Sequence, residues 1–144
     1  MRFEGRHQAQ IIDRCWSVYL WLVQAFILPE SFHVEFPAAA ESALVSDALH
    51  VTVPMTEQLA LSLREEYALG RQGLEVSRYS YNVIDRNGNN VLRADNLPYH
   101  KTDYRGRTLI HPPHHLHDKQ GRVRSFTGQL QDFISYAKSF LTSP

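Results

Sequence analysis

The sequence has little cysteine, no apolar run long enough to cross a membrane, and no excess of charge of either sign. A single cysteine, Cys15, excludes an internal disulfide, and residues 1–10 are too polar for a secretory signal. We therefore expect a reducing, cytoplasmic setting. Fifteen Lys plus Arg balance fifteen Asp plus Glu, so no global field directs the chain to nucleic acid or to an anionic membrane. Any contact with RNA or DNA must come from a local patch.

The longest apolar stretch, Trp16 to Leu28, is shorter than the roughly 20 residues that a membrane-spanning helix needs. We expect a helix over residues 8–28 with apolar side chains around nearly its whole circumference. One face would carry Trp16, Tyr19, Leu20, Val23 and Ile27, and much of the rest would carry Trp21, Leu22, Phe26 and Leu28. Such a helix usually has neighbours on two sides. It is either a central core helix or an interface that docks a partner chain, which includes a second copy in a homodimer.

Alternating apolar and polar residues predict an antiparallel sheet of about five strands over residues 31–94. The expected strands are 31–36, 49–53 with Pro54 at its end, 59–67, 74–84 and 91–94. Residues 85–89 contain the Asn-Gly pair that favours a hairpin turn. Consecutive hairpins give a meander with one face free to pack against helices.

A chain of 144 residues, 43% of them hydrophobic, can bury one compact core, so we expect a single domain. Apolar residues repeat at three and four positions over 127–141, which predicts a closing helix with Ser125 or Thr127 as its cap. The fold class is therefore α+β, with a helix on either side of the sheet in the sequence.

Between the sheet and the last helix, residues 95–118 show no hydrophobic periodicity. Five of the eight histidines and three of the seven prolines lie in this stretch. They are His100, His111, His114, His115 and His117, with Pro98, Pro112 and Pro113. A loop of this length is usually functional or disordered, and the prolines favour an ordered one. The other histidines, His7, His33 and His50, alternate with apolar residues and are expected to face solvent.

Four motifs in the second half of the chain occur in a fixed order. They are Arg78-Tyr79-Ser80-Tyr81, Asp85-Arg86-Asn87-Gly88, the run from Arg93 to His100, and the run from His111 to Asp118. Together they resemble the TumE-like toxin family, over roughly residues 74–142. Two positions depart from the family pattern, because Asn82 and Tyr99 stand where histidine is usual.

This resemblance implies a toxin of a two-gene toxin–antitoxin module that is neutralised by a helix-turn-helix antitoxin and acts on RNA. RNA cleavage without a metal needs a base for the 2′-hydroxyl, an acid for the leaving oxygen and a cation for the phosphate. The expected proton-transfer groups are His100, His114 and His117. The expected substrate-binding residues are Arg93, Arg105 and Arg107 for phosphate, Tyr99 and Tyr104 for stacking on bases, and Asp95, Asn96, His111 and His115 in the same loop. Some of them could instead only hold the loop, as Asp95 and Asn96 are good turn formers.

The sequence leaves two alternatives open. We expect no cofactor, yet His111, His114 and His117 could instead bind a transition metal such as zinc, with His115 as a further imidazole and Asp95 or Asp118 as an oxygen ligand. The protein could also be a non-catalytic binding protein whose loop recognises nucleic acid, a metal ion or a protein partner. Its zero net charge favours binding without catalysis, because a ribonuclease is expected to be basic.

Overall fold

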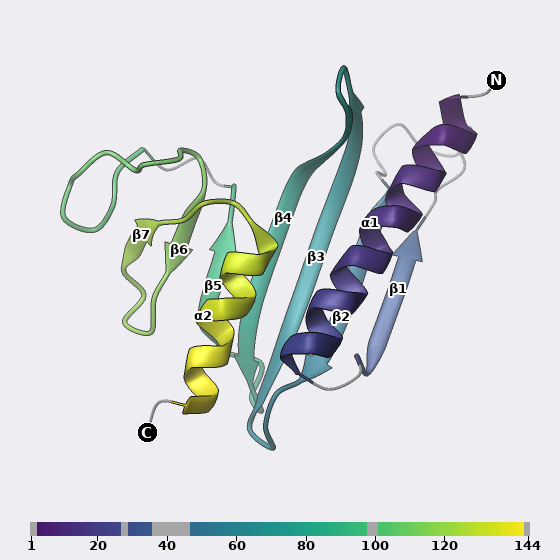
Figure 1. The fold of residues 1–144 in the computed structure, drawn as a ribbon. Helices are drawn as coiled ribbons and strands as arrows, with labels where there is room; N and C mark the ends of the chain where they lie inside the picture. Colours follow the sequence, from purple (N-terminus) through teal and green to yellow (C-terminus); the bar gives the residue numbers. More distant parts are fainter. Residues whose placement is uncertain (1–2, 27–28, 36–46, 98–100, 143–144) are drawn as a thin grey trace.

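We describe the fold from a computed structural model, which describes residues 3–26, 29–35, 47–97 and 101–142. Its elements are α1 (Phe3–Ala25), β1 (Ser31–Glu35), β2 (Ala48–Pro54), β3 (Leu59–Gly70), β4 (Gly73–Asp85), β5 (Asn90–Asp95), β6 (His115–His117), β7 (Val123–Ser125) and α2 (Leu130–Thr142). The seven strands form one antiparallel sheet in sequence order, and both helices cover the same face of it (Figure 1). The predicted α+β fold with a meander is confirmed, but the sheet has two strands more than expected.

The core lies between this face of the sheet and the helices. Alternate residues of the central strands point into it because successive side chains of a strand lie on opposite faces. The buried set includes Leu61 and Leu63 of β3, Tyr81 and Val83 of β4, and Phe133 of α2. Among the described residues, no helix is long and apolar enough to cross a membrane.

Helix α1 faces the sheet with Ile11, Cys15, Val18 and Leu22, which recur at the spacing of one helix face. The sequence had placed Trp16 and Leu20 on a leading apolar face, whereas 61% of Trp16 and 52% of Leu20 are exposed. Within the described residues α1 contacts both the sheet and α2, while its outer side is exposed, so an interface on that side stays a prediction. The predicted end of this helix, residues 27–28, lies outside the described part of the chain.

The same turn closes three hairpins, at Asp85–Asn89, Asp103–Arg107 and Asp118–Arg122. In each, the first aspartate accepts hydrogen bonds through Oδ1 from the backbone N–H groups two and four residues later. The glycine at the fourth position has φ between 76° and 81°, which only glycine adopts without strain. These features are those of a three-residue hairpin with a glycine bulge. The sequence analysis recognised this turn at residues 85–89 only.

The turns at residues 103–107 and 118–122 form hairpins within the stretch that the sequence predicts to be a loop. A bridge between Thr102 and Thr108 closes a small hairpin within it. His115–His117 then forms β6, which pairs with β5 on one side and β7 on the other. Helix α2 begins at Leu130, three residues later than expected, and Thr127 accepts a hydrogen bond from the Gln129 N–H (3.2 Å) ahead of it.

Candidate functional site

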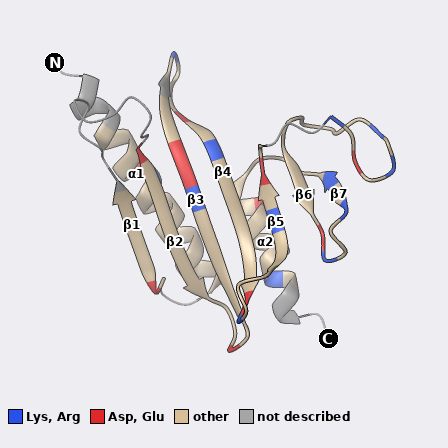
Figure 2. Cartoon of the chain, turned by 180° about the vertical axis from the view of Figure 1, so that it is seen from behind, with Lys and Arg blue, Asp and Glu red and all other residues tan. Residues whose placement is uncertain are grey.

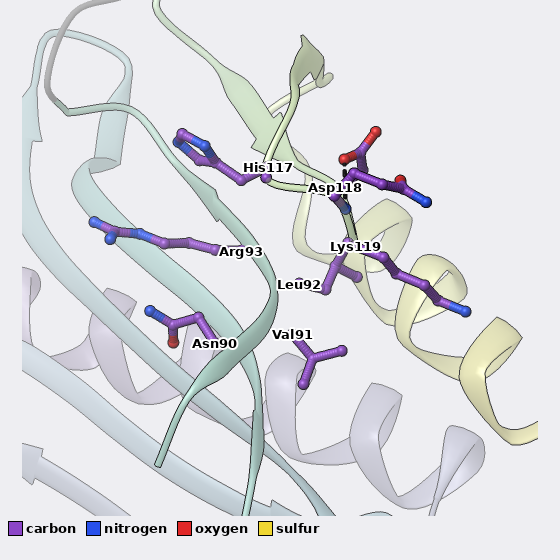
Figure 3. Close-up of a pocket in the computed structure, with 9 residues that line it drawn as sticks. Asn90, Val91, Leu92, Arg93, His117, Asp118 and Lys119 are labelled. Atoms are coloured by element: carbon purple, nitrogen blue, oxygen red, sulfur yellow. Dashed lines mark hydrogen bonds between the residues drawn. The ribbon is translucent and has the colours of Figure 1, made fainter. Parts of the chain in front are cut away.

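The residues of β3 and β5 that alternate with the buried ones lie on the face opposite the helices and include Arg64, Glu66 and Arg93. Figure 2 views the chain from behind relative to Figure 1 and marks charged residues along these strands. Register places the side chains of Arg93 and His117 next to each other on this face, since the two residues are direct partners in β5 and β6. They extend to the same side of the sheet in Figure 3, where Leu92 points the other way. A groove here is lined by Asn90, Arg93, His117, Asp118, Lys119 and Gln120, among others.

A cluster of four side chains extends from this groove into the interior and consists of Arg93, Asp95, His115 and His117. Asp95 receives Arg93 Nε at Oδ2 (2.6 Å), and its Oδ1 lies 2.6 Å from His115 Nε2. The other ring nitrogen of His115, Nδ1, is 2.9 Å from the carbonyl oxygen of Pro113. One donor atom each of Asp95, His115 and His117 lies within 4.8 Å of the others. Asp95 and His115 are 2% and 0% exposed.

Asp95 and His115 shift each other's pKa in opposite directions. Burial alone would lower the pKa of His115, but its ion pair with Asp95 and its bond to the Pro113 carbonyl raise the pKa above the usual value. Burial likewise opposes ionisation of Asp95, yet the charges of His115 and Arg93 lower the pKa of this carboxyl. His115 has no surface with which to touch a substrate, so its predicted contact role does not fit the structure. It holds Asp95 instead.

His114 lies on the helix-covered side of the sheet. Its Nδ1 is 2.8 Å from the Tyr79 hydroxyl, and the two rings stack with centroids 5.6 Å apart. The ring also lies against Gly128, where an added Cβ would come within 2.7 Å of it. Burial, with the charges of His111 and His115, lowers the pKa of His114. His114 and His117 therefore lie on opposite faces and cannot act as one acid–base pair.

The other predicted site residues are distributed as follows. His111 is exposed before β6, while His100 and Tyr99 lie outside the described residues. The alternative metal set of His111, His114 and His117 is not assembled, because His114 faces away from His117. Asn96 binds backbone at both ends of its amide, accepting from the Tyr79 N–H (3.2 Å) and donating to the Ser77 carbonyl (3.1 Å). Asn96 is thus occupied in holding the end of β5 to β4.

A second cluster surrounds Tyr104 on the Asp103–Arg107 hairpin. The guanidinium groups of Arg105, Arg122 and Arg124 lie 4.8–5.2 Å from its ring centroid. The Tyr104 N–H donates to the carbonyl of Val123 at 2.8 Å, which ties the hairpin to β7. A groove beside the ring is lined by Asp103, Tyr104, Arg105, Arg107, Arg124 and Tyr136, among others. We call Tyr104 and the four arginines Arg105, Arg107, Arg122 and Arg124 the Tyr104 patch.

Asp118 fixes two of these arginines. Its Oδ2 lies 3.1 Å from Arg122 Nε and 2.6 Å from Arg124 Nε. Burial alone would raise the pKa of Asp118, but hydrogen bonds from Arg124 and from the backbone of Arg122 and Gln120 together outweigh it and lower the pKa to about 2. Arg124 is the cross-strand partner of Leu116, so the Tyr104 patch lies on the side of β6 and β7 that faces the helices, and the Arg93–His117 groove lies on the opposite side. The two are joined along the chain at the hairpin, because Asp118 follows His117 directly.

A buried polar network, which the sequence had not led us to expect, lies between α1 and the sheet. Glu65, 1% exposed, receives Arg14 at both oxygens (3.1 and 2.7 Å) and hydroxyl groups from Tyr67 (2.7 Å) and Tyr81. The signal was present, because Glu65 has the same inward parity as Leu61 and Leu63. With every acceptor paired, the network is a structural element of the core rather than a site.

Comparison with known proteins identifies no relative whose site could be compared with this one. No family model, no curated protein and no solved structure matches the chain. The resemblance to the TumE-like toxins therefore remains carried by the motif residues alone. The structure places their first motif on β4, the second in the β4–β5 turn, and the start of the third on β5.

Proposed function

We propose that this protein binds single-stranded RNA through the Tyr104 patch. The observation that carries the proposal is an aromatic ring flanked by three guanidinium groups beside a groove. Base stacking on an aromatic ring is tolerant of sequence, and arginine forks match phosphate geometry. This local patch provides the cationic surface that a chain without net charge requires for RNA.

The proposal extends to cleavage: the protein is the endoribonuclease toxin of a toxin–antitoxin module, in keeping with its motif resemblance. His117 would then transfer a proton and Arg93 would hold phosphate, because both line the groove that lies across the β6–β7 hairpin from the Tyr104 patch. Of the three predicted proton-transfer histidines, His117 is half-buried at this groove and His114 is not on this face. The second proton-transfer group would be His100, which the sequence assigns to the same loop.

The separation of His114 from His117 favours a second candidate, a binding protein that recognises RNA without cleaving it. The two candidates share the Tyr104 patch and differ only in the role of His117. A test of binding therefore precedes a test of cleavage.

The binding test uses fluorescence anisotropy with a labelled single-stranded RNA oligonucleotide and a duplex of the same sequence. Tyr104→Ala should weaken single-strand binding by about 5- to 150-fold, which corresponds to the roughly 1–3 kcal/mol of a base–aromatic stack. Arg71→Gln, on the β3–β4 turn outside the patch, is the matched control and should bind as the native chain does. Equal affinity of native protein and Tyr104→Ala would refute RNA binding at this patch.

A partner surface belongs to the same proposal. On the outer side of α1, Ile12, Trp16 and Leu20 are exposed, and Trp16 lines an apolar groove with Phe32 and Val34 of β1. If the protein is a toxin, its antitoxin binds this outer side of α1 in our proposal. A second copy of the chain is the alternative partner for the same surface. Trp16→Glu should keep the melting temperature and abolish co-purification with a co-expressed neighbouring antitoxin. If Trp16→Glu instead converts a dimer into a monomer, this surface is a homodimer interface.

A further inference from the structure

The buried cluster beneath the Arg93–His117 groove has the composition and geometry of a metal centre. We propose that Asp95, His115 and His117 bind one transition-metal ion of the zinc class through Asp95 Oδ1, His115 Nε2 and one ring nitrogen of His117. These three residues are a selection from the histidines and aspartates that the sequence offered for a metal, without His111 and His114. The inference does not rest on RNA binding or cleavage, since metal affinity is measured without RNA. A ring nitrogen of His117 that binds the ion transfers no proton, so the proton-transfer role proposed for His117 does not apply to that nitrogen when metal is bound.

The strands bring these three donors together. His115 and His117 are two residues apart on β6, which places both rings on the same face of the sheet. Their ring centroids are 5.0 Å apart at an interplanar angle of 79°. Asp95 is the direct cross-strand partner of His115 on β5. A ligand set held on paired strands is more precise than one on a loop.

The contacts of His115 favour a cation between its ring and Asp95. Nδ1 lies 2.9 Å from the Pro113 carbonyl, an acceptor only, so the proton of a neutral ring belongs on Nδ1. Nε2 then directs a lone pair at Asp95 Oδ1, 2.6 Å away. Two acceptors at this distance need a proton or a metal ion between them. The bond from Nδ1 to a carbonyl is also the usual orienting contact of a metal-ligating histidine.

His117 is the reason to prefer a metal over a proton alone. One proton between His115 and Asp95 engages two acceptors, whereas a metal ion also engages the ring nitrogen of His117, which lies within 4.8 Å of the other two donor atoms. A tetrahedral zinc site with bonds of about 2.0–2.1 Å needs donors about 3.4 Å apart, which the present spacing within 4.8 Å reaches with small side-chain rotations. Arg93 binds only Oδ2 and leaves Oδ1 for the ion. Three protein ligands leave one position open toward the groove, as in catalytic zinc sites.

The test is isothermal titration calorimetry of the full chain with Zn²⁺ after dialysis against a chelator. We expect one equivalent to bind. Loss of an outer-sphere partner typically costs about 10–100-fold in affinity, so loss of a ligand in His117→Ala should cost at least about 100-fold. His111→Ala is the matched control, because it removes an exposed histidine of the alternative set, and it should bind as the native chain does.

A thermal melt of His117→Ala without metal shows whether the variant is folded. If it is not, ¹⁵N spectra of labelled histidine rings in the native chain decide the question. The resonances of His115 and His117 should then shift together at one equivalent of Zn²⁺. The proposal is overturned if the native chain binds no Zn²⁺, if folded His117→Ala binds it equally well, or if the shifts occur at His111 instead.

Discussion

The His114 ring stacks on the Tyr79 ring with its Nδ1 2.8 Å from the Tyr79 hydroxyl, on the side of the sheet that faces the helices. His117, three residues later, belongs to the opposite face. The same histidine-rich segment therefore supplies one imidazole to the core and another to the exposed groove. Two alanine substitutions separate these roles.

His117→Ala should leave the melting temperature nearly unchanged and remove activity. If His117 is a general acid or base, RNA cleavage should fall by about 10²- to 10⁴-fold, and growth inhibition on expression should disappear. His114→Ala should show the reverse, with a lower melting temperature and residual cleavage in the folded fraction. Full toxicity of a folded His117→Ala chain would leave RNA binding without catalysis as the function.

Gly128→Ala should be more destabilising than Gly121→Ala. Both glycines have positive φ, 83° and 76°, so alanine costs about 1–3 kcal/mol of backbone strain at either position. Of these two positions, only Gly128 places the added Cβ against a side chain, the His114 ring at 2.7–2.9 Å, whereas no atom of the described residues lies within 4 Å at Gly121. Urea unfolding of the two variants measures the difference, and equal losses would show that the His114 ring moves aside freely.

The sequence predicted the sheet well where strands are long. β3 and β4 carry a full period-two pattern, and their predicted ranges lie within the observed ones. β6 and β7 have three residues each, too few for an alternation to be recognised, so the histidine stretch was interpreted as a loop. The Asp-x-x-Gly spacing of Asp103–Gly106 and Asp118–Gly121 repeats that of Asp85–Gly88 and could have revealed the two hairpins.

The candidate site was predicted in composition but not in arrangement. Arg93, Asp95 and His117 were each predicted as site residues. Their proximity depends on the register between β5 and β6, which the sequence does not specify because β6 is so short. The separation of His114 from His117 follows from the same parity. The Tyr104 patch was partly anticipated through Tyr104, Arg105 and Arg107. Arg122 and Arg124 were missed because they join the patch only when β7 pairs with β6.

Cys15 should react slowly with thiol reagents in the folded protein. Burial, with a smaller contribution from the charge of Glu65, raises the pKa of Cys15 to about 11 from 9.0. At pH 8 the thiolate fraction is then about 100-fold lower than in the unfolded chain, and only the thiolate reacts. Because the thiol form is favoured in the folded state, this contribution to stability is present at neutral pH and is lost as pH rises above 9. Gln72→Cys in a Cys15→Ser background supplies an exposed thiol as the control. Labelling of native Cys15 as fast as this control would contradict its buried position.

Arg14→Leu should be among the most destabilising substitutions of the helix, because it leaves the Glu65 carboxylate buried without a cation. Removing one partner of a buried ion pair typically costs about 3–5 kcal/mol. The Arg14 side chain is 24% exposed and the Glu65 side chain 1%, so the penalty comes mainly from the carboxylate. Tyr67 and Tyr81 still donate to it but supply no compensating charge.

A double-mutant cycle with Glu65→Gln isolates this cause. Glutamine keeps an acceptor oxygen for a tyrosine hydroxyl and carries no charge, so Arg14→Leu should cost much less in the Glu65→Gln background than in the native one. The free energy of unfolding in urea measures all four chains. Arg64→Leu is the matched control, since its partner Glu66 is near the surface at 3.5 Å and an exposed pair contributes at most about 1 kcal/mol. If Arg14→Leu costs the same in both backgrounds, its stabilising effect comes from packing of the Arg14 side chain, whose guanidinium carbon lies 5.2 Å from the Trp21 ring centroid, rather than from the ion pair with Glu65.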